Sequence, residues 1–500
     1  MKDTPYLIAI DQGTTSTRAL IFDDDFNILG TARTPIRPSF PAPGHVEQDA
    51  GAIHRSLSAV MEEAVLQAGV APAACRGIGI TNQRETVIIW DRHTGLPVYP
   101  AIVWQSRQSE DICRNLRDAG CEEMIRTRTG LRIDPYFSAT KIRWITSRRP
   151  DVADGLRKGD LLIGTVDSWA VWHLSGGTRH ITDITNASRT LLFNINTLTW
   201  DPELCALFDI PMHALPEIVD NCGILAETTP TAFFGRRVPI TGLIGDQQAA
   251  LLGQRCFRPG DIKNTYGTGG FLLMNTGTQR ANATDGLLQT VAYKLDDTPH
   301  FALEGAIFVS GSLIQWLRDG LGLIETAADS ARLAGSVSDS GGVVIVPAFT
   351  GLACPYWDEQ CRGGILNLTR GTTKAHLVRA ALEAMCTQVK DVCDAMTRAS
   401  GQTIRSLRVD GGASANPVLL QLQADLLQAP VRRADCVEAT ALGAAMAAVM
   451  GLGLKKIQDF SPLPVQTFLP QMPPEQANAM MARWHHAVDV TRQFTTNMEQ

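Results

Sequence analysis

The sequence predicts an α/β protein built from two similar domains. Apolar strands alternate with amphipathic helices along the 500 residues, which is the α/β pattern. A strand, a turn rich in glycine and threonine, and a second strand occur once in each half. A chain of this length is expected to form roughly two to four domains. We expect a boundary near residues 250–256, with residues 1–253 forming one domain and residues 254–500 the other.

Composition and charge exclude several classes of protein. Apolar residues make up 44% of the chain and charged residues 19%, which argues against intrinsic disorder. The 45 Lys and Arg against 51 Asp and Glu leave a net charge of −6, so we expect no nucleic-acid partner. The 11 cysteines contain no C-x-x-C pair, which argues against a zinc site or a disulfide framework and favours the reducing cytoplasm.

Two segments bear on membrane insertion, and both argue against it. Residues 1–11 carry an acidic residue at position 3 and only a short apolar run, which indicates a strand rather than a signal peptide. Residues 439–454 are uncharged but rich in Ala and Gly, and a bilayer span needs about 20 apolar residues. We therefore expect a buried, closely packed helix there and no membrane span.

The first half begins with a strand pair and then an amphipathic helix. Apolar residues recur at helical spacing after Asp49, which predicts a helix over 50–68 with Asp49 as its N-cap. Short apolar runs bounded by polar turns predict four strands, at 6–11, 17–22, 77–83 and 86–91. The last two enclose the dipeptide Arg84-Glu85, which from spacing alone is expected to be a solvated pair on a hairpin.

The second half repeats the same devices. Residues 263–275 read as strand, Gly/Thr turn and strand, and residues 406–427 read as strand, Gly-Gly turn and helix. Asn416 can cap that helix, and Pro417 suits its first position. The repetition is one of supersecondary structure rather than of sequence identity, so we expect two similar domains that face each other.

The glycine-rich turns suggest phosphate binding. Gly and Thr leave backbone N–H groups and hydroxyls accessible to phosphate oxygens. One such turn alone would be read as a tight hairpin, but three follow apolar strands: Gly13–Thr17, Gly267–Gly270 and Gly411-Gly412. The chain has no Gly-Lys dipeptide, so it contains no Walker A loop, and no G-x-G-x-x-G follows a strand.

Asp11 ends the first strand, at the lip of the first turn. Mg²⁺ bound to a triphosphate usually keeps several waters and takes one or two protein carboxylates. Asp11 could hold such an ion, or it could simply cap the turn, and position alone leaves both open.

A set of motifs in order resembles the FGGY carbohydrate kinases, and among them the members that act on glycerol. The resemblance spans about residues 6–455 and rests on AIDQGTTSTRA, GITNQRET, AIVWQ, DPYFS, YFSATKIRW, GDQQAAL, NTYGTGGF, VPAFTGL and VDGGASAN. It implies two duplicated actin-like ATPase (ribonuclease H-like) domains with a central cleft. It further implies Mg²⁺-dependent transfer of phosphate from ATP to a terminal hydroxyl of glycerol, giving sn-glycerol 3-phosphate and ADP. Relatives form dimers and tetramers, so we expect a homodimer or homotetramer.

The resemblance also assigns roles to individual residues. Asp246 matches the catalytic base, and we expect Asp11 and Asp246 to be the metal ligands. The nucleotide contacts it implies are Thr14, Thr15, Ser16, Arg18, Thr268, Gly311, Gln315, Gly412 and Asn416. The glycerol contacts it implies are Arg84, Glu85, Trp104, Tyr136, Asp246, Gln247 and Phe271.

The residue types independently suit a small triol. Such a substrate needs donors and acceptors for its hydroxyls and an apolar wall for its carbons, and desolvated polar partners reject substrates without the matching hydroxyl. Arg84 can donate, Glu85 and Asp246 can accept, and three aromatics can form the wall. Without the resemblance, those aromatics would be assigned to core packing and Asp246 equally well to a helix cap.

Other interpretations stay open on the sequence. A kinase of the same family acting on a pentulose or hexonate is the nearest rival, and a non-enzymatic actin-like ATPase is a rival from another class. A degenerate kinase is disfavoured because Asp11, Arg18, Thr268 and Asp246 are all present. In some bacterial members the loop matching residues 231–242 binds fructose 1,6-bisphosphate, but here Phe233-Phe234 puts that inhibition in doubt.

Overall fold

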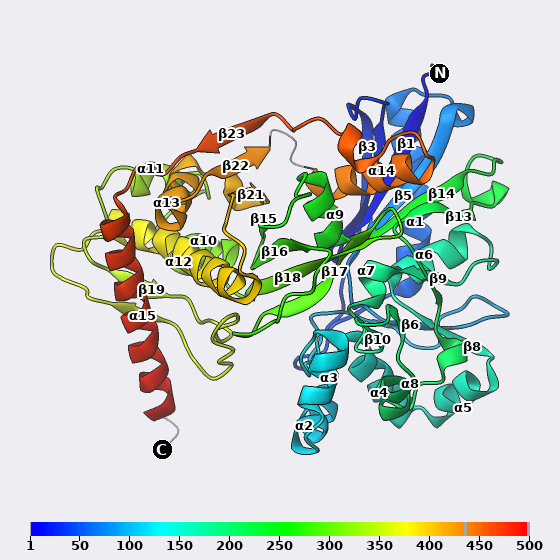
Figure 1. Ribbon diagram of the computed structural model, residues 1–500, viewed down its shortest axis with the longest axis horizontal. Coiled ribbons are helices and arrows are strands. Elements are labelled where there is room, and N and C mark those ends of the chain that lie inside the picture. Colours follow the sequence, from blue (N-terminus) through cyan, green and yellow to red (C-terminus); the bar gives the residue numbers. More distant parts are fainter. Residues whose placement is uncertain (1, 435–437, 498–500) are drawn as a thin grey trace. The chain divides into compact units, whose positions relative to one another are not determined.

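The computed structural model describes residues 2–434 and 438–497, and these form two compact units (Figure 1). Unit 1 comprises the chain through Gly253 together with Thr290–Phe301 and Glu438–Ser461. Unit 2 comprises the remaining described residues. The sequence predicted a linear division at 253/254. The first boundary between the compact units also falls after Gly253. Two later segments nevertheless belong to unit 1, so neither unit is contiguous in sequence.

Unit 1 is built on a six-stranded sheet with the strand order β13-β14-β5-β1-β2-β3. β1 pairs antiparallel with β2 and parallel with β5, and β14 pairs parallel with β5. The predicted strand pair at the start of the chain is therefore confirmed. The strands of this sheet are β1 (Tyr6–Gln12), β2 (Ser16–Phe22), β3 (Ile28–Pro35), β5 (Cys75–Asn82), β13 (Cys222–Glu227) and β14 (Pro239–Gly245).

Helix α1 (Ala50–Ala68) covers one face of this sheet. The predicted N-cap is present, because the Asp49 side chain accepts a hydrogen bond from the Gly51 N–H at 2.8 Å. Gly69 ends the helix in the left-handed conformation, at φ 66°. Leu57 and Met61 pack in one apolar cluster with alternate residues of β1 and β5.

Helix α14 (Ala439–Gly451) packs on the opposite face. A Cβ atom at Gly79 of β5 would overlap the carbonyl oxygen of Ala444, so only glycine allows the helix to approach this closely. The predicted buried helix within 439–454 is confirmed. Among the helices of the described residues, none combines the length and the apolar character that a bilayer crossing needs.

One feature of the predicted strand pattern is wrong. The residues after Arg84-Glu85 form β6 (Ile88–Asp91), which pairs antiparallel with β8 (Leu161–Gly164) rather than with β5. The chain therefore passes from one sheet to another at residues 83–86, and Arg84-Glu85 is not on a hairpin. Local spacing could not reveal this, because the partner of β6 lies about 70 residues further along the chain.

The remaining elements of unit 1 are short. Its strands are β4 (Glu47–Gln48), β7 (Ala101–Ile102), β9 (Ile181–Asp183), β10 (Phe193–Asn194), β11 (Thr199–Trp200) and β12 (Glu217–Val219). Its helices are α2 (Glu110–Asp118), α3 (Glu122–Thr129), α4 (Ser138–Arg148), α5 (Pro150–Lys158), α6 (Val166–Leu174), α7 (Ile184–Ala187), α8 (Pro202–Leu207) and α9 (Asp246–Gly253).

Unit 2 is built on a seven-stranded sheet with the order β17-β18-β16-β15-β21-β22-β23, although residues 290–301, at the tip of the β17–β18 hairpin, belong to unit 1. Its strands are β15 (Asp261–Tyr266), β16 (Gly270–Gly277), β17 (Leu288–Lys294), β18 (Pro299–Ile307), β21 (Ser406–Asp410), β22 (Val431–Ala434) and β23 (Val465–Phe468), with β19 (Val344–Val346) and β20 (Gly364–Leu366) forming a separate pair.

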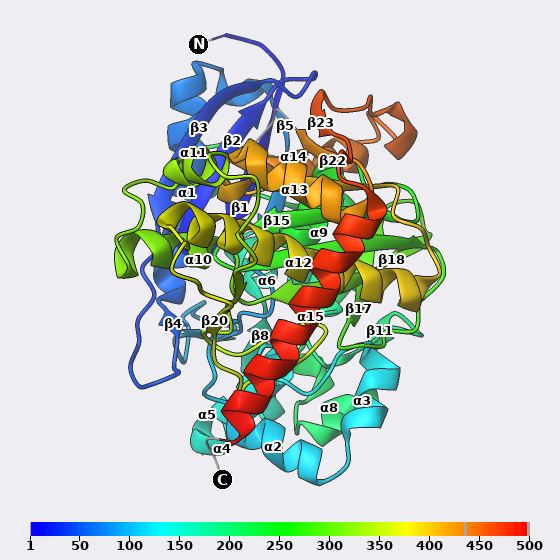
Figure 2. The same cartoon turned by 90° about the vertical axis from the view of Figure 1, so that its left-hand side faces the viewer.

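Helices complete the core of unit 2. Leu382 and Val389 of α12 share an apolar cluster with Leu272 of β16 and Trp484 of α15. Figure 2 shows α15 lying across this side of the unit. The helices are α10 (Gly311–Gln315), α11 (Asp329–Ala334), α12 (Lys374–Ser400), α13 (Pro417–Leu427) and α15 (Pro474–Asn497).

The two units share one supersecondary pattern. β15 pairs antiparallel with β16 and parallel with β21, as β1 does with β2 and β5. In each case a glycine-containing turn joins the antiparallel pair. The duplicated α/β architecture predicted from the sequence is therefore confirmed.

Candidate active site

The carboxyl ends of three parallel strands gather the predicted residues of unit 1. Gln12 of β1 and Gly245 of β14 both pair with Asn82 of β5, so β1, β5 and β14 end at one edge of the sheet. Asp11, the dipeptide Arg84-Glu85 and Asp246 all lie at these ends. With strands spaced about 4.8 Å apart, the backbones at the ends of β1 and β14 are separated by about 10 Å.

Arg84 is the buried centre of this group, with 2% of its side chain exposed. Its Nε lies 3.2 Å from Oδ1 of Asp246, and it also donates to the Gln248 amide oxygen at 3.2 Å and to the Tyr136 hydroxyl at 3.4 Å. Gly245 makes room for it, because a Cβ there would lie 2.9 Å from Cδ of Arg84. The solvated pair expected from spacing alone is thus replaced by a buried guanidinium that orients a carboxylate and a phenol.

Glu85 forms a buried ion pair with Arg189. Its Oε1 accepts a hydrogen bond from Nε of Arg189 at 2.6 Å, and both side chains are almost fully buried. Its backbone adopts the left-handed conformation, at φ 61°, which is uncommon for a residue with a side chain. Strain of this kind persists where the surroundings fix the residue, and it occurs often at ligand sites.

Trp104 and Tyr136 form an aromatic corner next to Arg84. Their ring centroids are 5.6 Å apart at 69°, an edge-to-face arrangement. The indole Nε1 of Trp104 donates to the Thr14 hydroxyl at 2.9 Å. The first glycine-threonine turn is therefore joined directly to the aromatic wall, although 90 residues separate the two in sequence.

Asp11 and Arg18 face each other across the β1–β2 pair. The Arg18 guanidinium contacts the Asp11 carboxylate and also the Glu438 carboxylate at 2.8 Å. Burial raises the pKa of Asp11 above its usual value, and the positive charge of Arg18 opposes that rise. Thr15, at the tip of the turn, is exposed, whereas Ser16 is buried at the start of β2.

Asp246 is more accessible than Asp11 or Glu85, with 28% of its side chain exposed. It begins α9, and its Oδ1 accepts a hydrogen bond from the Gln247 N–H at 2.7 Å. Residues 2–434 and 438–497 contain no group of three or more His, Cys, Asp and Glu side chains placed to hold a metal. Because Mg²⁺ needs only one or two carboxylates plus waters and phosphate oxygens, Asp11 and Asp246 suit an ion carried by a nucleotide.

In unit 2 the predicted second phosphate turn joins β15 to β16 and is exposed at its tip, at Gly267 and Thr268. The Thr268 carbonyl accepts from the N–H groups of Ser310 and Ser312, at 3.0 and 3.1 Å. The Gly311 N–H donates to the Gly267 carbonyl at 2.9 Å, and a Cβ at Gly311 would lie 2.5 Å from that oxygen. Backbone hydrogen bonds therefore join this turn to the start of α10.

The third predicted glycine turn, Gly411-Gly412, lies at the end of β21. Gly411 has φ 84°, and a Cβ there would overlap the Tyr266 carbonyl, so this turn packs on the end of β15. Gly412 is exposed, and a Cβ there would meet nothing within 4 Å. The Asn416 side chain caps α13 by accepting from the Val418 N–H at 2.9 Å, which confirms the predicted cap. Its amide also donates to Ser330.

Two further predicted residues belong to unit 2, one on the helix whose start contacts the first of these turns and one directly after that turn. Gln315, exposed, ends α10, and Phe271, partly exposed, is the second residue of β16. The structure groups the unit 1 residues by direct contacts, and it places the unit 2 residues at two glycine turns.

Comparison with known proteins decides the family. Residues 6–253 match the N-terminal domain and residues 262–452 the C-terminal domain of the FGGY family of carbohydrate kinases. The chain belongs to this family. It is 49% identical to a glycerol kinase of Staphylococcus epidermidis over 98% of this chain and 99% of that protein, and 50% identical to one of Stenotrophomonas maltophilia over the same shares.

Solved structures of FGGY kinases and related proteins share the fold. A crystal structure of Plasmodium falciparum glycerol kinase with ADP superposes with a TM-score of 0.92 at 34% identity, covering 98% of both chains. Gluconate kinase from Lactobacillus acidophilus reaches a TM-score of 0.88 at 19% identity, again over 98% of both chains. The duplicated actin-like ATPase fold predicted from the sequence is confirmed.

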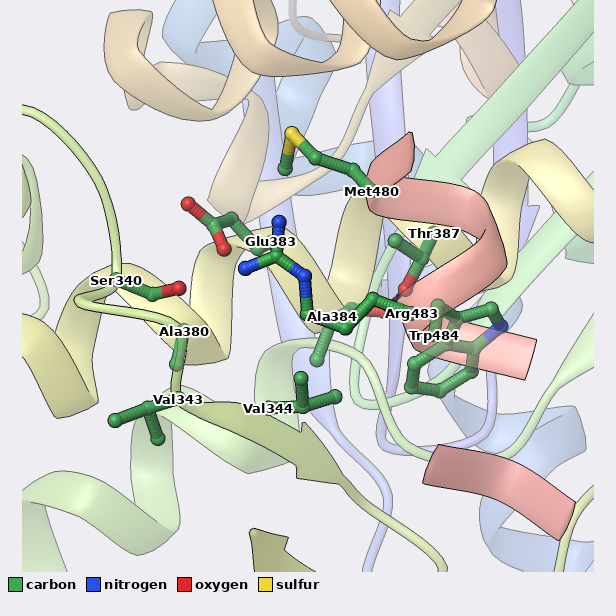
Figure 3. A pocket seen from close by; sticks show the side chains of 10 residues that line it. All are labelled: Ser340, Val343, Val344, Ala380, Glu383, Ala384, Thr387, Met480, Arg483 and Trp484. Atoms are coloured by element: carbon green, nitrogen blue, oxygen red, sulfur yellow. Dashed lines mark hydrogen bonds between the residues drawn. The ribbon is translucent and has the colours of Figure 1, made fainter. Parts of the chain in front are cut away.

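A small pocket in unit 2 is lined by none of the predicted site residues of this FGGY chain. Glu383 of α12 and Arg483 and Trp484 of α15 help to line it, together with Ser340 (Figure 3). Its cavity volume of about 30 Å³ holds one or two water molecules and excludes a nucleotide or a sugar.

Four residues that support the FGGY site were not singled out from the sequence. Glu438, Gln248 and Arg189 contact Arg18, Arg84 and Glu85 respectively. Lys141, fully buried, donates to the carbonyls of Pro135 at 2.7 Å and Phe137 at 3.2 Å, and also to that of Tyr136. Gln248 and Lys141 lie inside the quoted motifs, but Arg189 and Glu438 carry no local signal.

Phe233, in the segment that resembles a regulatory loop, is fully buried in the apolar cluster of unit 1. Its ring packs edge-to-face on Phe234, with centroids 5.2 Å apart. The segment is thus anchored by a core residue where the resemblance would place a ligand-binding loop.

Proposed function

We propose that this chain is an ATP-dependent kinase that phosphorylates a terminal hydroxyl of glycerol, giving sn-glycerol 3-phosphate and ADP. One observation carries the proposal. Arg84, Tyr136, Trp104 and Asp246 form a connected polar and aromatic group at a strand edge, in a chain half identical over its length to glycerol kinases.

Glycerol would bind against the aromatic corner. The rings of Trp104 and Tyr136, with Phe271 from β16, would cover its carbons, and Arg84, Glu85 and Gln247 would bond its hydroxyls. The buried Arg84 keeps its position through three partners before any substrate arrives, so little ordering is needed on binding.

Phosphoryl transfer needs positioning and charge stabilisation more than covalent chemistry. Asp246, held by Arg84 and partly exposed, would orient and deprotonate the attacking hydroxyl. We propose that Thr14, Thr15, Ser16, Arg18 and Thr268 contact the phosphates, and that Gly311, Gln315, Gly412 and Asn416 contact the nucleoside end. Asp11 and Asp246 would hold Mg²⁺, which neutralises phosphate charge when bound.

The rival functions are less well supported. A non-enzymatic ATPase would not need a buried arginine, a carboxylate and an aromatic wall at the first turn, and the chain is a carbohydrate kinase by family. The gluconate and xylulose kinases that share the fold do so at 17–23% identity, and this similarity supports the fold but not their substrates.

The experiment that tests the proposal is a coupled assay of ADP release with ATP and Mg²⁺. It compares glycerol, D-xylulose, gluconate and no acceptor. We expect release that depends on glycerol, with the product phosphorylated on a terminal hydroxyl. A higher rate with D-xylulose or gluconate would reassign the substrate, and release that ignores every acceptor would remove the kinase function.

Replacing the proposed base provides the second arm. Asp246→Asn keeps the size of the side chain but removes the basic carboxylate, so kcat is expected to fall by about 10²- to 10⁴-fold. The affinity for ATP should stay within about threefold. Asp209→Asn changes an exposed carboxylate that pairs with Arg143 and serves as the matched control. Near wild-type turnover by Asp246→Asn would exclude it as the base.

Activity in the cytoplasm and assembly into a homodimer or homotetramer complete the proposal. Both rest on the resemblance to the family rather than on contacts within this chain. Sedimentation of the purified protein checks the assembly.

A further inference from the structure

A buried polar network lies directly behind the strand end that carries Asp246. Its centre is Asp183, which is fully buried where β9 meets α7. The carboxylate accepts hydrogen bonds from the N–H of Thr185 at 2.7 Å, from the Asn221 side chain at 2.9 Å and from the Asn186 side chain at 2.5 Å. The Thr185 hydroxyl donates to it as well. Each of these groups donates to the carboxylate, while burial and the neighbouring Asp167 carboxylate raise the pKa of Asp183 to about 7.

Thr185 links the Asp183 carboxylate to β14, the strand that leads to Asp246. Its Oγ1 donates to the Asp183 carboxylate and at the same time accepts a hydrogen bond from the Gly245 N–H at 2.9 Å. Gly245 is the last residue of β14, and Asp246 follows it. The hydroxyl therefore connects the buried carboxylate to the peptide group between Gly245 and the preceding residue, one position before the proposed base.

A second branch of the same network reaches the strand that leads to Arg84. The amides of Asn186 and Asn82 bond each other in both directions at 3.0 Å, and Asn82 also donates to the Gln83 carbonyl at 2.8 Å. Asn221 adds a bond to the Leu243 carbonyl of β14 at 2.9 Å. The network thus holds the ends of β5 and β14 together.

We propose that Thr185 is a positioning residue. Its hydroxyl bridges the Asp183 carboxylate and the Gly245 N–H, and this bridge fixes the backbone at Gly245 and Asp246. The proposal rests on the proposed function only in naming Asp246 as the base. An isosteric side chain without the hydroxyl would leave the buried Gly245 N–H unbonded, which is unfavourable for a buried donor. The backbone at Gly245 and Asp246 would then relax, and a small displacement of a reacting group costs up to about 10²-fold in rate.

The test compares three variants of the full chain. Thr185→Val removes the hydroxyl at nearly constant shape, and Thr185→Ser restores it. Thr228→Val is the matched control, because the buried Thr228 hydroxyl likewise accepts from a backbone N–H, that of Val238 at 2.9 Å, but just before the opposite end of β14. We measure kcat and KM for glycerol and ATP, the Tm, and the hydrogen-exchange protection of the Gly245 amide.

We expect Thr185→Val to lower kcat by about 10- to 100-fold while KM for ATP stays within threefold. Thr185→Ser should return kcat to within about threefold of wild type. Thr228→Val should lower the Tm by a similar amount to Thr185→Val and leave kcat unchanged. A parallel loss of kcat in both valine variants would overturn the proposal, because the effect would then be general destabilisation.

The amide readout separates this proposal from the proposed function. If Thr185→Val keeps full protection at Gly245, the bridge is absent whatever the substrate. If the wild-type chain shows no glycerol-dependent turnover but the variant loses protection at Gly245 alone, the positioning contact stands and the function assigned to Asp246 fails. Should Thr185→Val not fold, Thr185→Ser against Thr185→Ala gives the same comparison at smaller volume.

Discussion

Arg84 is a buried residue for which we propose a role in binding as well as in stability. It contacts the partly exposed Asp246, its Nε lies 4.0 Å from Glu85 Oε1, and it donates to neutral groups on Gln248 and Tyr136. A buried guanidinium is tolerated only when nearly all of its donors have partners. The arrangement therefore pre-forms a donor surface that a substrate hydroxyl can join without a conformational search.

Removing this side chain should weaken glycerol binding selectively. Arg84→Ala is expected to raise KM for glycerol by about 10- to 100-fold, since hydrogen bonds from charged groups contribute roughly 1.5–3 kcal/mol, while KM for ATP changes little. The free energy of unfolding should also fall by roughly 1–3 kcal/mol, because the buried Gln248 amide oxygen loses its donor. Arg143→Ala, at an exposed pair with Asp209, is the control. An unchanged KM for glycerol would exclude Arg84 from the substrate site.

At the scale of residues, the sequence predicted those that lie in contiguous motifs and missed those that act from a distance. The contact between Thr14 and Trp104, both already assigned to the site, could not be seen, because 90 residues separate them. Glu438 reaches Arg18 from 420 residues away, and Arg189 reaches Glu85 from 104. Such partners are set by the tertiary fold, so no local pattern marks them.

At the scale of elements, glycine determines how closely α14 approaches β5. A side chain at Gly79 would overlap the backbone of Ala444, and neither the strand nor the buried helix can move without disturbing the sheet. Gly79→Ala is therefore expected to lower the free energy of unfolding by about 1–3 kcal/mol or more.

Gly371→Ala is the matched control, because a Cβ at that exposed position would meet its nearest atom at an ordinary 3.7 Å. Chemical denaturation of both variants checks the difference. Equal stability would mean that α14 can shift away from β5 without cost.

A stacked histidine pair joins α1 to α6 and predicts acid sensitivity of this contact. The rings of His54 and His173 lie 3.8 Å apart, nearly parallel. Burial lowers the pKa of His173 to about 4 and also lowers that of His54. The unfolded chain titrates these groups near pH 6.5, so between pH 6.5 and 4 it binds more protons than the folded chain. This part of the stability is complete above pH 6.5 and is lost as the pH falls towards 4.

Replacing His173 should reduce that loss. Thermal unfolding at pH 7.5 and 5.0 is compared for wild type, His173→Phe and the exposed-site control His93→Gln. We expect His173→Phe to recover at most about 2 kcal/mol of the stability that wild type loses on acidification. A loss as large in His173→Phe as in wild type would assign the acid sensitivity to other groups.

Local signals predicted most elements because each needs only nearby residues. The Asp49 cap, the Asn416 cap and both glycine-turn strand pairs follow from short patterns. β6 was placed correctly as a strand, but its partner was not, because pairing with β8 depends on segments that lie far apart in the chain.

At the scale of the molecule, the duplication could be predicted and the exact composition of the units could not. The strand–turn–strand pattern repeats visibly in sequence, so two similar domains follow from it. The return of Glu438–Ser461 to unit 1 depends on small residues of α14 matching glycines on β5, β14 and α9. Surface complementarity of this kind is visible only when the segments are already folded.

The division into units predicts which parts of the chain each substrate protects. All proposed glycerol contacts except Phe271 lie in unit 1, whereas proposed nucleotide contacts lie in both units. In hydrogen exchange of the full chain, saturating glycerol should slow exchange in peptides covering 82–86, 134–138 and 244–248. ADP should slow exchange at 11–18 and 410–416, with little effect of glycerol alone on 410–416, because a ligand protects the amides that its binding holds closed. Ethylene glycol, which lacks one hydroxyl and one carbon, is the control ligand. Equal protection of 410–416 by glycerol and by ADP would contradict the prediction that glycerol is bound mainly by residues of unit 1.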